Sequence, residues 1–455
     1  MRGRTLHEVA RAVGGLPIGA DVEVTSVATD SRLVRPGALF VAMPGAHTDG
    51  GLFVPEAFGF GATAALVRDG TDVPGPAVFV RSTGDALLKL ATDERRGSAA
   101  TVIGVTGANG KTSTKDLTAA VLAQRMRTHA SIASFNNEVG LPMTILDAAP
   151  STEALVCEMG ARRAGDVALL CEVASPNVVV VTNVGVAHLE IFGSWEAIVE
   201  ASAEPVDALG PDGVAVLNAD DEVVAGYASR CRGRVVTFGL AAGADVRATG
   251  VRLGDDGCAS FTLEIPAASQ TERVDLAVPG EHMVGNALAA AAVGHVLGLS
   301  AADCAAGLKG ASVSPWRMET FTSPEGVRVI NDAYNANPES MAAALKAARW
   351  MARDVALIAV LGPMAELGAI ADEEHERVGE LATRLRVDRV VTVGEPARTI
   401  AAAAVREGVE PENVASYDTA EEALADVREH ARRGDVVLFK ASRVAGLERL
   451  AEALR

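Results

Sequence analysis

The residues with the clearest chemical meaning form one stretch, Thr106-Gly107-Ala108-Asn109-Gly110-Lys111-Thr112-Ser113-Thr114. This stretch follows the β-like run 101–105 and precedes the segment 116–124, in which alanine and leucine recur at helical spacing. A strand, a glycine-rich turn and a helix in this order suit the phosphates of a nucleotide. Backbone N–H groups of the turn close around the phosphate oxygens, and the helix N-terminus favours negative charge. The sequence therefore predicts a phosphate-binding loop.

Two side chains of this loop have expected roles of their own. Lys111 can reach the β- and γ-phosphates, and the hydroxyl of Thr112 can ligate Mg²⁺. The strict pattern requires glycine at position 105, where this chain has Val105; its glycines stand at 104, 107 and 110. An ordinary glycine-rich turn is the alternative interpretation, but the strand–loop–helix context favours phosphate binding.

Composition narrows the class of protein. A chain of 455 residues is long enough for two to four domains, and three is the expectation. The net charge of −18 argues against a nucleic-acid partner or a membrane-surface role. No apolar run approaches the ~18–20 residues that span a bilayer, and the first residues lack the apolar core and cleavage site of a signal peptide. We therefore expect a cytoplasmic protein without membrane insertion.

The five cysteines predict neither a disulfide framework nor a zinc site. They are odd in number and far apart, and no Cys-x-x-Cys pair occurs. We expect them to be reduced and mostly buried.

The elements around the loop are expected to form three α/β domains. Residues 1–83 alternate short β-like runs with turn signals, which indicates a small α/β unit. Residues 84–313 alternate strand and helix signals, which indicates a largely parallel sheet with helices on both faces, and 246–278 suggests an appended antiparallel sheet. Residues 314–455 predict a second doubly wound, Rossmann-like domain, although its glycine pattern is poor.

Polar residues follow several predicted strands of the central unit, at the edge where α/β proteins bind ligands. Glu158 ends one such strand, and His188 lies in the loop after the next. A carboxylate and a neutral imidazole could together hold a divalent ion, although each is also common as a purely structural residue. The loop Asn136-Asn137-Glu138 is similarly open to either interpretation.

The third unit has an unusually polar loop after its first buried strand. It runs Asn331-Asp332-Ala333-Tyr334-Asn335-Ala336-Asn337-Pro338-Glu339-Ser340-Met341. A simple connection requires fewer polar residues, so the loop is a candidate for ligand binding. Capping of the next helix is the alternative.

Several of these segments occur together, and in the same order, in one family. They are Thr106–Thr112, Phe135-Asn136-Asn137-Glu138, Glu158-Met159-Gly160, Thr182-Asn183-Val184-Gly185 with His188, and Asp332–Pro338. Further matches are Thr29-Asp30-Ser31-Arg32, Asn218-Ala219-Asp220-Asp221 and Lys440-Ala441-Ser442-Arg443. Together they resemble the ATP-dependent Mur ligases, and the resemblance covers essentially the whole chain.

The resemblance implies amide synthesis through an acyl phosphate, with ATP and Mg²⁺, in peptidoglycan precursor synthesis. The implied donor is a UDP-linked muramoyl tripeptide, and the implied acceptor amine is D-Ala-D-Ala. The resemblance also implies a monomer whose third domain closes over ATP.

The same resemblance assigns roles to individual residues. It implies that Lys111, Glu158 and His188 are catalytic. It implies ATP contacts for Gly107, Asn109, Gly110, Lys111, Thr112, Ser113, Asn286, Arg317 and Asp332. It implies that Ser31 and Asp49 hold the uridine nucleotide and that Asn136, Asn137, Tyr334, Asn335 and Asn337 line the substrate cleft. One Mg²⁺ is expected on Thr112 and a second on Glu158 and His188.

Four positions depart from the family pattern. Ser202 stands where the family usually has a lysine that is carbamylated to face the metal, so the second metal site loses a ligand or recruits another, such as Glu204 or Glu200. The other departures are Gly51 for a usual histidine, Pro363 for a common acid, and Trp316 before the arginine, where glycine or another residue often stands.

These departures leave two alternatives to the housekeeping reaction. The first is a divergent paralogue that joins a different amine, for example in secondary metabolism. The second is a nucleotide-binding protein with impaired catalysis.

Overall fold

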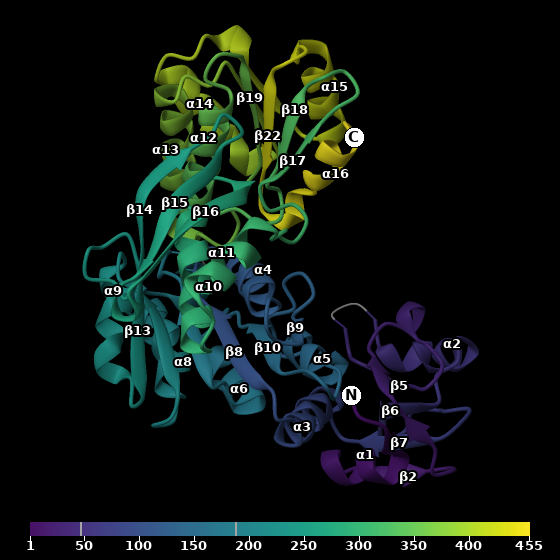
Figure 1. Ribbon diagram of the computed structural model, residues 1–455. Coiled ribbons are helices and arrows are strands. Elements are labelled where there is room, and N and C mark those ends of the chain that lie inside the picture. The colour runs from purple at the N-terminus through teal and green to yellow at the C-terminus, as the bar shows by residue number, and fades with distance from the viewer. Residues whose placement is uncertain (46–47, 187–188) are drawn as a thin grey trace.

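The computed structural model describes residues 1–45, 48–186 and 189–455 and contains three α/β domains (Figure 1). In Figure 1 the first domain, in purple, lies at the lower right beside the blue part of the central domain, and the green-to-yellow third domain lies above the central domain. The α/β class with mostly parallel sheets is confirmed. We keep the domain boundaries at 83/84 and 313/314 as a proposal.

The first domain contains a five-stranded sheet with the order β2-β7-β6-β5-β4, in which only β2 is antiparallel to its neighbour. Its elements are β1 (Arg4–Thr5), α1 (Leu6–Val13), β2 (Leu16–Ile18), β3 (Glu23–Val24), β4 (Ser26–Ala28), β5 (Ala38–Val41), α2 (Val54–Gly59), β6 (Ala64–Arg68) and β7 (Ala77–Val80).

The central domain contains a nine-stranded sheet with the order β16-β15-β14-β13-β12-β11-β8-β10-β9. It is parallel from β9 to β14 and antiparallel from β14 to β16. Its strands are β8 (Thr101–Thr106), β9 (Thr128–Ala130), β10 (Ala154–Glu158), β11 (Val178–Val181), β12 (Val214–Asn218), β13 (Arg234–Gly239), β14 (Val246–Leu253), β15 (Cys258–Ile265) and β16 (Gln270–Pro279).

The helices of this region cover the sheet. They are α3 (Thr83–Arg96), α4 (Lys111–Leu122), α5 (Gly140–Asp147), α6 (Asp166–Ala174), α7 (Leu189–Phe192), α8 (Trp195–Asp207), α9 (Glu222–Gly226), α10 (Met283–Val296) and α11 (Ala301–Lys309). Small side chains bury α10 almost completely, with Ala287 to Ala292 inaccessible to solvent. This packing fixes α4, which carries the phosphate loop, between α10 and the sheet.

The third domain has the sheet order β17-β18-β22-β19-β20-β21, with only β17 antiparallel. Its elements are β17 (Glu319–Thr322), β18 (Arg328–Asn331), α12 (Pro338–Met351), β19 (Leu357–Leu361), α13 (Ala371–Arg384), β20 (Arg389–Val393), α14 (Arg398–Arg406), β21 (Val414–Tyr417), α15 (Ala420–His430), β22 (Val436–Lys440) and α16 (Glu448–Glu452).

The sequence predicted reduced cysteines and no membrane-spanning segment. All five cysteines are free, three of them buried. Within the described ranges, no helix combines the length and the apolar character that crossing a bilayer requires.

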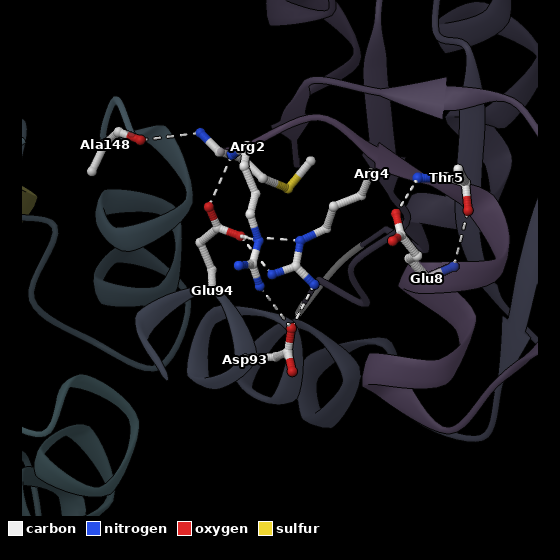
Figure 2. A network of polar contacts seen from close by, with 8 residues as sticks. Arg2, Arg4, Thr5, Glu8, Asp93, Glu94 and Ala148 are labelled. Carbon is white, nitrogen blue, oxygen red and sulfur yellow. Dashed lines mark hydrogen bonds and ion pairs between the residues drawn. The ribbon is translucent and has the colours of Figure 1, made fainter. Parts of the chain in front are cut away.

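A cluster of charged side chains fastens the first domain to α3 (Figure 2). Arg4 is 5% exposed, and its guanidinium contacts Asp93 Oδ2 and Glu94 Oε2, each at 2.6 Å. The backbone N–H of Arg2 donates to Glu94 Oε1 at 2.9 Å, and the terminal amine of Met1 donates to the carbonyl of Ala148 at 3.1 Å. The N-terminal strand is therefore tied to two helices of the neighbouring unit.

The third domain also contacts the central domain away from the phosphate loop, at the turn between β14 and β15. The indole N–H of Trp350, on α12, donates to the carbonyl of Gly254 at 2.8 Å. Arg353 forms an ion pair with Asp255, which lies next to Gly254 in the turn between β14 and β15. The appended antiparallel strands thus reach the third domain, as Figure 1 also shows.

The Arg4 cluster predicts that replacing Arg4 lowers the free energy of unfolding more than replacing Arg2. Arg4→Met leaves the half-buried Asp93 and Glu94 without their closest cation, so we expect a loss of about 3–5 kcal/mol in the free energy of unfolding. Arg2→Met is the control, because Arg2 is about half exposed, and its loss should be at most about 1 kcal/mol. Urea titration followed by circular dichroism measures both, and equal losses would contradict the role given to Arg4.

Candidate functional site

The phosphate loop joins β8 to α4 in a conformation that only glycine adopts readily at two positions. Gly107 has φ +132° and Gly110 has φ +78°. Gly110 is the N-cap of α4 and has no side chain to cap it, so the first N–H groups of α4 have no side-chain acceptor. These groups and the helix dipole provide the anion site that the sequence predicted.

Thr182 and Asn183 hold this loop in place from the end of β11. The hydroxyl of Thr182 donates to the carbonyl of Asn109 at 2.7 Å. Asn183 accepts from the N–H of Ala108 through its carbonyl (2.9 Å) and from the N–H of Asn109 through its side chain (2.8 Å). The loop is thus preorganised by main-chain contacts before any ligand binds.

Lys111 lies folded over the loop. Its Nζ donates to the carbonyls of Gly107 (2.6 Å) and Ala108 (3.2 Å). Burial lowers the pKa of Lys111, and the nearby Arg317 lowers it further, whereas the negative charge of Glu158 raises it. An additional anion in the cleft would favour the charged form of this amine.

The hydroxyl of Thr112 is the meeting point of two domains. It lies 3.0 Å from the hydroxyl of Ser134 and accepts from Arg317 Nη2 at 2.9 Å. Arg317 Nη2 also donates to Ser134 at 3.2 Å. A guanidinium group of the third domain therefore reaches into the phosphate loop of the central domain.

Glu158, the last residue of β10 beside β8, provides a buried carboxylate from the central domain. It is 1% exposed, and its Oε1 accepts from Asn136 Nδ2 at 2.8 Å. Its Oε2 is buried without a hydrogen-bond partner among the described residues. Because a buried carboxylate oxygen without a partner is costly, this atom fits a divalent cation. His188, the other expected ligand, lies outside the described residues.

The polar loop after β18 contributes the wall from the third domain. Lys440 is 2% exposed, and its Nζ donates to Asp332 Oδ2 at 2.6 Å and to the carbonyl of Asn335 at 3.0 Å. Asn337 caps α12 and donates through Nδ2 to Asn109 Oδ1 at 2.8 Å. This loop therefore both caps a helix and contacts the phosphate loop.

These groups surround one cleft of about 1160 Å³ between the central and third domains. Of the residues expected at the site, it is lined by Asn109, Gly110, Lys111, Thr112, Ser113, Asn136, Asn137, Glu158, Asn286, Arg317, Asp332, Tyr334, Asn335 and Asn337. Gly107 lies behind the lining, against Thr182. Asn286 packs behind Gly110 and accepts from the hydroxyl of Thr114 at 3.3 Å.

The two residues expected at the uridine nucleotide lie elsewhere. Ser31 and Asp49 belong to the first domain and do not line this cleft. Ser31 donates to Glu56 Oε2 at 3.1 Å, and Asp49 accepts from the N–H of Gly51 and pairs with Arg68. Their nucleotide role stays a prediction.

The acidic residues suggested as substitutes for the missing carbamate have other partners. Ser202 lies on α8 and does not line the cleft. Glu204 accepts from the N–H groups of Gly165 (2.6 Å) and Ala168 (2.9 Å) and so caps α6. Glu200 pairs with Arg230 at 2.8 Å on the surface. Neither acid is directed to a metal in this structure.

Some site residues were missed by the sequence analysis. Ser134 makes close contacts in the cleft, yet no spacing rule distinguishes a serine in a loop. Lys440 lies in a segment matched to the family but was given no role of its own. Trp316 was noted only as a departure. It has φ +62°, and the guanidinium of Arg443 lies 4.3 Å above its ring. Glycine would adopt this conformation without strain.

The tight packing at Gly107 gives a test of the loop. A Cβ at this position would lie 2.1 Å from Thr182 Oγ1 and 2.9 Å from the carbonyl of Asn183. We expect Gly107→Ala to cost about 1–3 kcal/mol of stability and to weaken ATP binding at least about tenfold, because the loop must shift. Calorimetric titration measures the affinity. Gly226→Ala is the control, since a Cβ there meets nothing within 4 Å. Unchanged ATP affinity in Gly107→Ala would contradict a phosphate-binding role.

Three family models match consecutive parts of the chain. The Mur ligase family catalytic domain matches residues 23–95, the Mur ligase middle domain 105–294, and the Mur ligase glutamate ligase domain 316–443.

Individual relatives match over nearly the full length. The UDP-N-acetylmuramoyl-tripeptide–D-alanyl-D-alanine ligase of Mycobacterium tuberculosis is 41% identical, with 99% of this chain and 97% of the relative covered. The ligase of the same name from Bacillus subtilis is 35% identical, covering 99% and 98%.

Solved structures also match nearly the full length of the chain. A crystal structure of MurF from Acinetobacter baumannii has a TM-score of 0.87 at 30% identity, covering 99% of this chain and 98% of that one. MurF from Thermotoga maritima in complex with ADP has a TM-score of 0.81 at 30% identity, covering 95% and 97%.

The chain therefore belongs to the Mur ligase family. It is an ATP-dependent ligase, as the sequence motifs predicted. Among the relatives, the tripeptide–D-alanyl-D-alanine ligases match it along essentially its whole length.

Proposed function

We propose that this enzyme joins D-Ala-D-Ala to the terminal carboxylate of UDP-N-acetylmuramoyl-tripeptide, with conversion of ATP to ADP and phosphate. The observation that carries the proposal is the cleft itself, where the phosphate loop, the buried carboxylate of Glu158 and the guanidinium of Arg317 converge. Full-length similarity to ligases of that name supports the choice of substrates.

The chemical difficulty is to bring a carboxylate against the anionic γ-phosphate of ATP. The donor carboxylate attacks that phosphate, ADP leaves, and the amine of the acceptor then displaces phosphate from the acyl phosphate. Lys111 and Arg317 place positive charge beside the phosphate loop. Their part is to offset the repulsion and to hold the γ-phosphate in line with the carboxylate.

Mg²⁺ fits this site as a cofactor. Thr112 offers a hydroxyl oxygen and Glu158 an unpartnered carboxylate oxygen, both suitable for this ion. When bound, Mg²⁺ would neutralise charge between the two anions. We also assign His188 to a metal, as the family resemblance implies.

The remaining assignments follow the arrangement of the domains. The first domain, with Ser31 and Asp49, would hold the uridine nucleotide, and the peptide would extend to Glu158. Asn136, Asn137, Tyr334, Asn335 and Asn337 would border the reacting groups. Because both nucleotide substrates are cytoplasmic metabolites, we propose a cytoplasmic enzyme, acting as a monomer.

One assay tests the reaction. The purified enzyme is given ATP, Mg²⁺ and UDP-N-acetylmuramoyl-tripeptide, with or without D-Ala-D-Ala, and released phosphate and the amide product are measured. We expect phosphate release that requires D-Ala-D-Ala and equals product formation. Turnover with a different amine alone would overturn this acceptor, and no turnover with any amine would favour a binding protein.

Removal of the loop lysine tests the mechanism. Lys111→Ala should lower kcat at least about 10³-fold, because the positive charge is lost where negative charge is brought together. Lys89→Ala, an exposed lysine on α3, is the control and should be unaffected. Activity retained within tenfold in Lys111→Ala would exclude the loop from phosphoryl transfer.

Ser202 favours the divergent paralogue as a second candidate. The nearby acids Glu200 and Glu204 are bound to other partners, so they do not replace a carbamate in this structure. We expect Ser202→Lys to raise kcat several-fold and to make it dependent on bicarbonate, whereas Ser202→Ala should change neither. No gain in Ser202→Lys would show that the serine does not limit this enzyme.

A further inference from the structure

Arg443 is held on the cleft wall of the third domain in an unusual way. Its guanidinium carbon lies 4.3 Å from the ring centroid of Trp316 and 6.0 Å from that of Tyr334. Its Nη1 also pairs with Glu448 Oε1 at 3.1 Å, and Glu448 is buried. Two aromatic rings and one fixed carboxylate therefore restrict an otherwise flexible side chain.

These contacts leave part of the guanidinium available. The group has five N–H donors, and stacking covers its faces rather than its edges. Glu448 is the one ion-pair partner of Arg443 within the described ranges. Because Arg443 also lines the cleft and is about half exposed, its remaining donors can receive an anion there.

Trp316 adopts a backbone conformation that bulky residues avoid. Its φ of +62° lies in the left-handed region, where glycine would be unstrained. Such strain persists where the surrounding structure and function require it. The indole of Trp316 lies against Arg443 and thereby orients it. This departure from the family pattern therefore acts on the cleft.

The position of Arg443 is within reach of an acceptor of dipeptide length whose amine lies at the phosphate loop. Arg317 lies 4.1 Å from the Tyr334 ring centroid and Arg443 lies 6.0 Å from it, so the two guanidinium carbons are no more than about 10 Å apart. Arg317 itself contacts Thr112 of the phosphate loop. An extended dipeptide spans roughly 7 Å. A dipeptide with its carboxylate at Arg443 can thus bring its amine to the loop end of the cleft.

We propose that Arg443, oriented by Trp316, binds the C-terminal carboxylate of the acceptor dipeptide and selects acceptors that carry one. This inference rests on the proposed function, in which the acceptor is D-Ala-D-Ala. A phosphate of ATP is the other anion that a cleft arginine could bind, and the experiment separates the two.

The test compares D-Ala-D-Ala with its C-terminal amide, which keeps the attacking amine and lacks the negative charge. For the natural enzyme, KM for the amide should be about 10–100-fold higher than for the acid. Arg443→Gln should raise KM for the acid by a similar factor. It should leave KM for the amide, for ATP and for the donor within about twofold.

A second variant tests whether stacking on Trp316 orients Arg443. Trp316→Gly relieves the left-handed backbone and removes the ring, so we expect a folded enzyme with KM for the acid raised about 2–10-fold and KM for the amide unchanged. Arg455→Gln is the matched control. Arg455 lies 4.6 Å from the ring centroid of Phe321 but does not line the cleft, so every KM should stay at its natural value.

The outcomes separate this inference from the proposed reaction. If Arg443→Gln raises KM equally for acid and amide, or raises KM for ATP, Arg443 does not bind the acceptor carboxylate, although the reaction stands. If the natural enzyme does not turn over D-Ala-D-Ala, the proposed function fails first and the inference fails with it.

Discussion

The contact between Arg317 and the Thr112 hydroxyl joins the two halves of the site. Thr112 belongs to a loop that Thr182 and Asn183 fix to the central sheet, and Arg317 begins the third domain. This contact, together with the hydrogen bond between Asn337 and Asn109, brings the two walls of the cleft together. Without it, the polar loop of the third domain would face solvent rather than the phosphate loop.

The buried charged residues of the site differ in whether the protein itself neutralises them. Lys440 neutralises Asp332, and both are largely withdrawn from solvent. Glu158, in contrast, keeps one buried oxygen for which the described part of the chain offers no partner. A ligand or cation that meets this oxygen gains an interaction that the protein alone does not provide, because an unpaired buried carboxylate is costly. The protein thus folds with Asp332 and Lys440 paired, whereas the carboxylate of Glu158 requires a further partner from a ligand or a cation.

The strand–loop–helix of the phosphate loop could be predicted because its glycines, Lys111 and flanking periodicity lie together in the chain. The strand β8 was predicted to within one residue, whereas short edge strands such as β9 and β17 were missed, because few residues carry their pattern. Glu158 could be identified from its place at a strand end. Ser134 could not, since its contact with Thr112 spans more than 20 residues of chain. Arg443 lies in a matched segment, but its contact with Trp316, more than 100 residues away, could not be predicted. Asn137 lines the cleft but also bonds the N–H groups that begin α5, a structural role the sequence left open.

The hydrogen bond from Trp350 to Gly254 has a consequence for motion. The third domain touches the central domain both at the phosphate loop and at the turn between β14 and β15. A rotation that opens the cleft must either break the Trp350 contact or carry the antiparallel strands along with α12. A rotation of the third domain that opened the cleft would therefore deform the β14–β16 extension as well as the linker before Arg317.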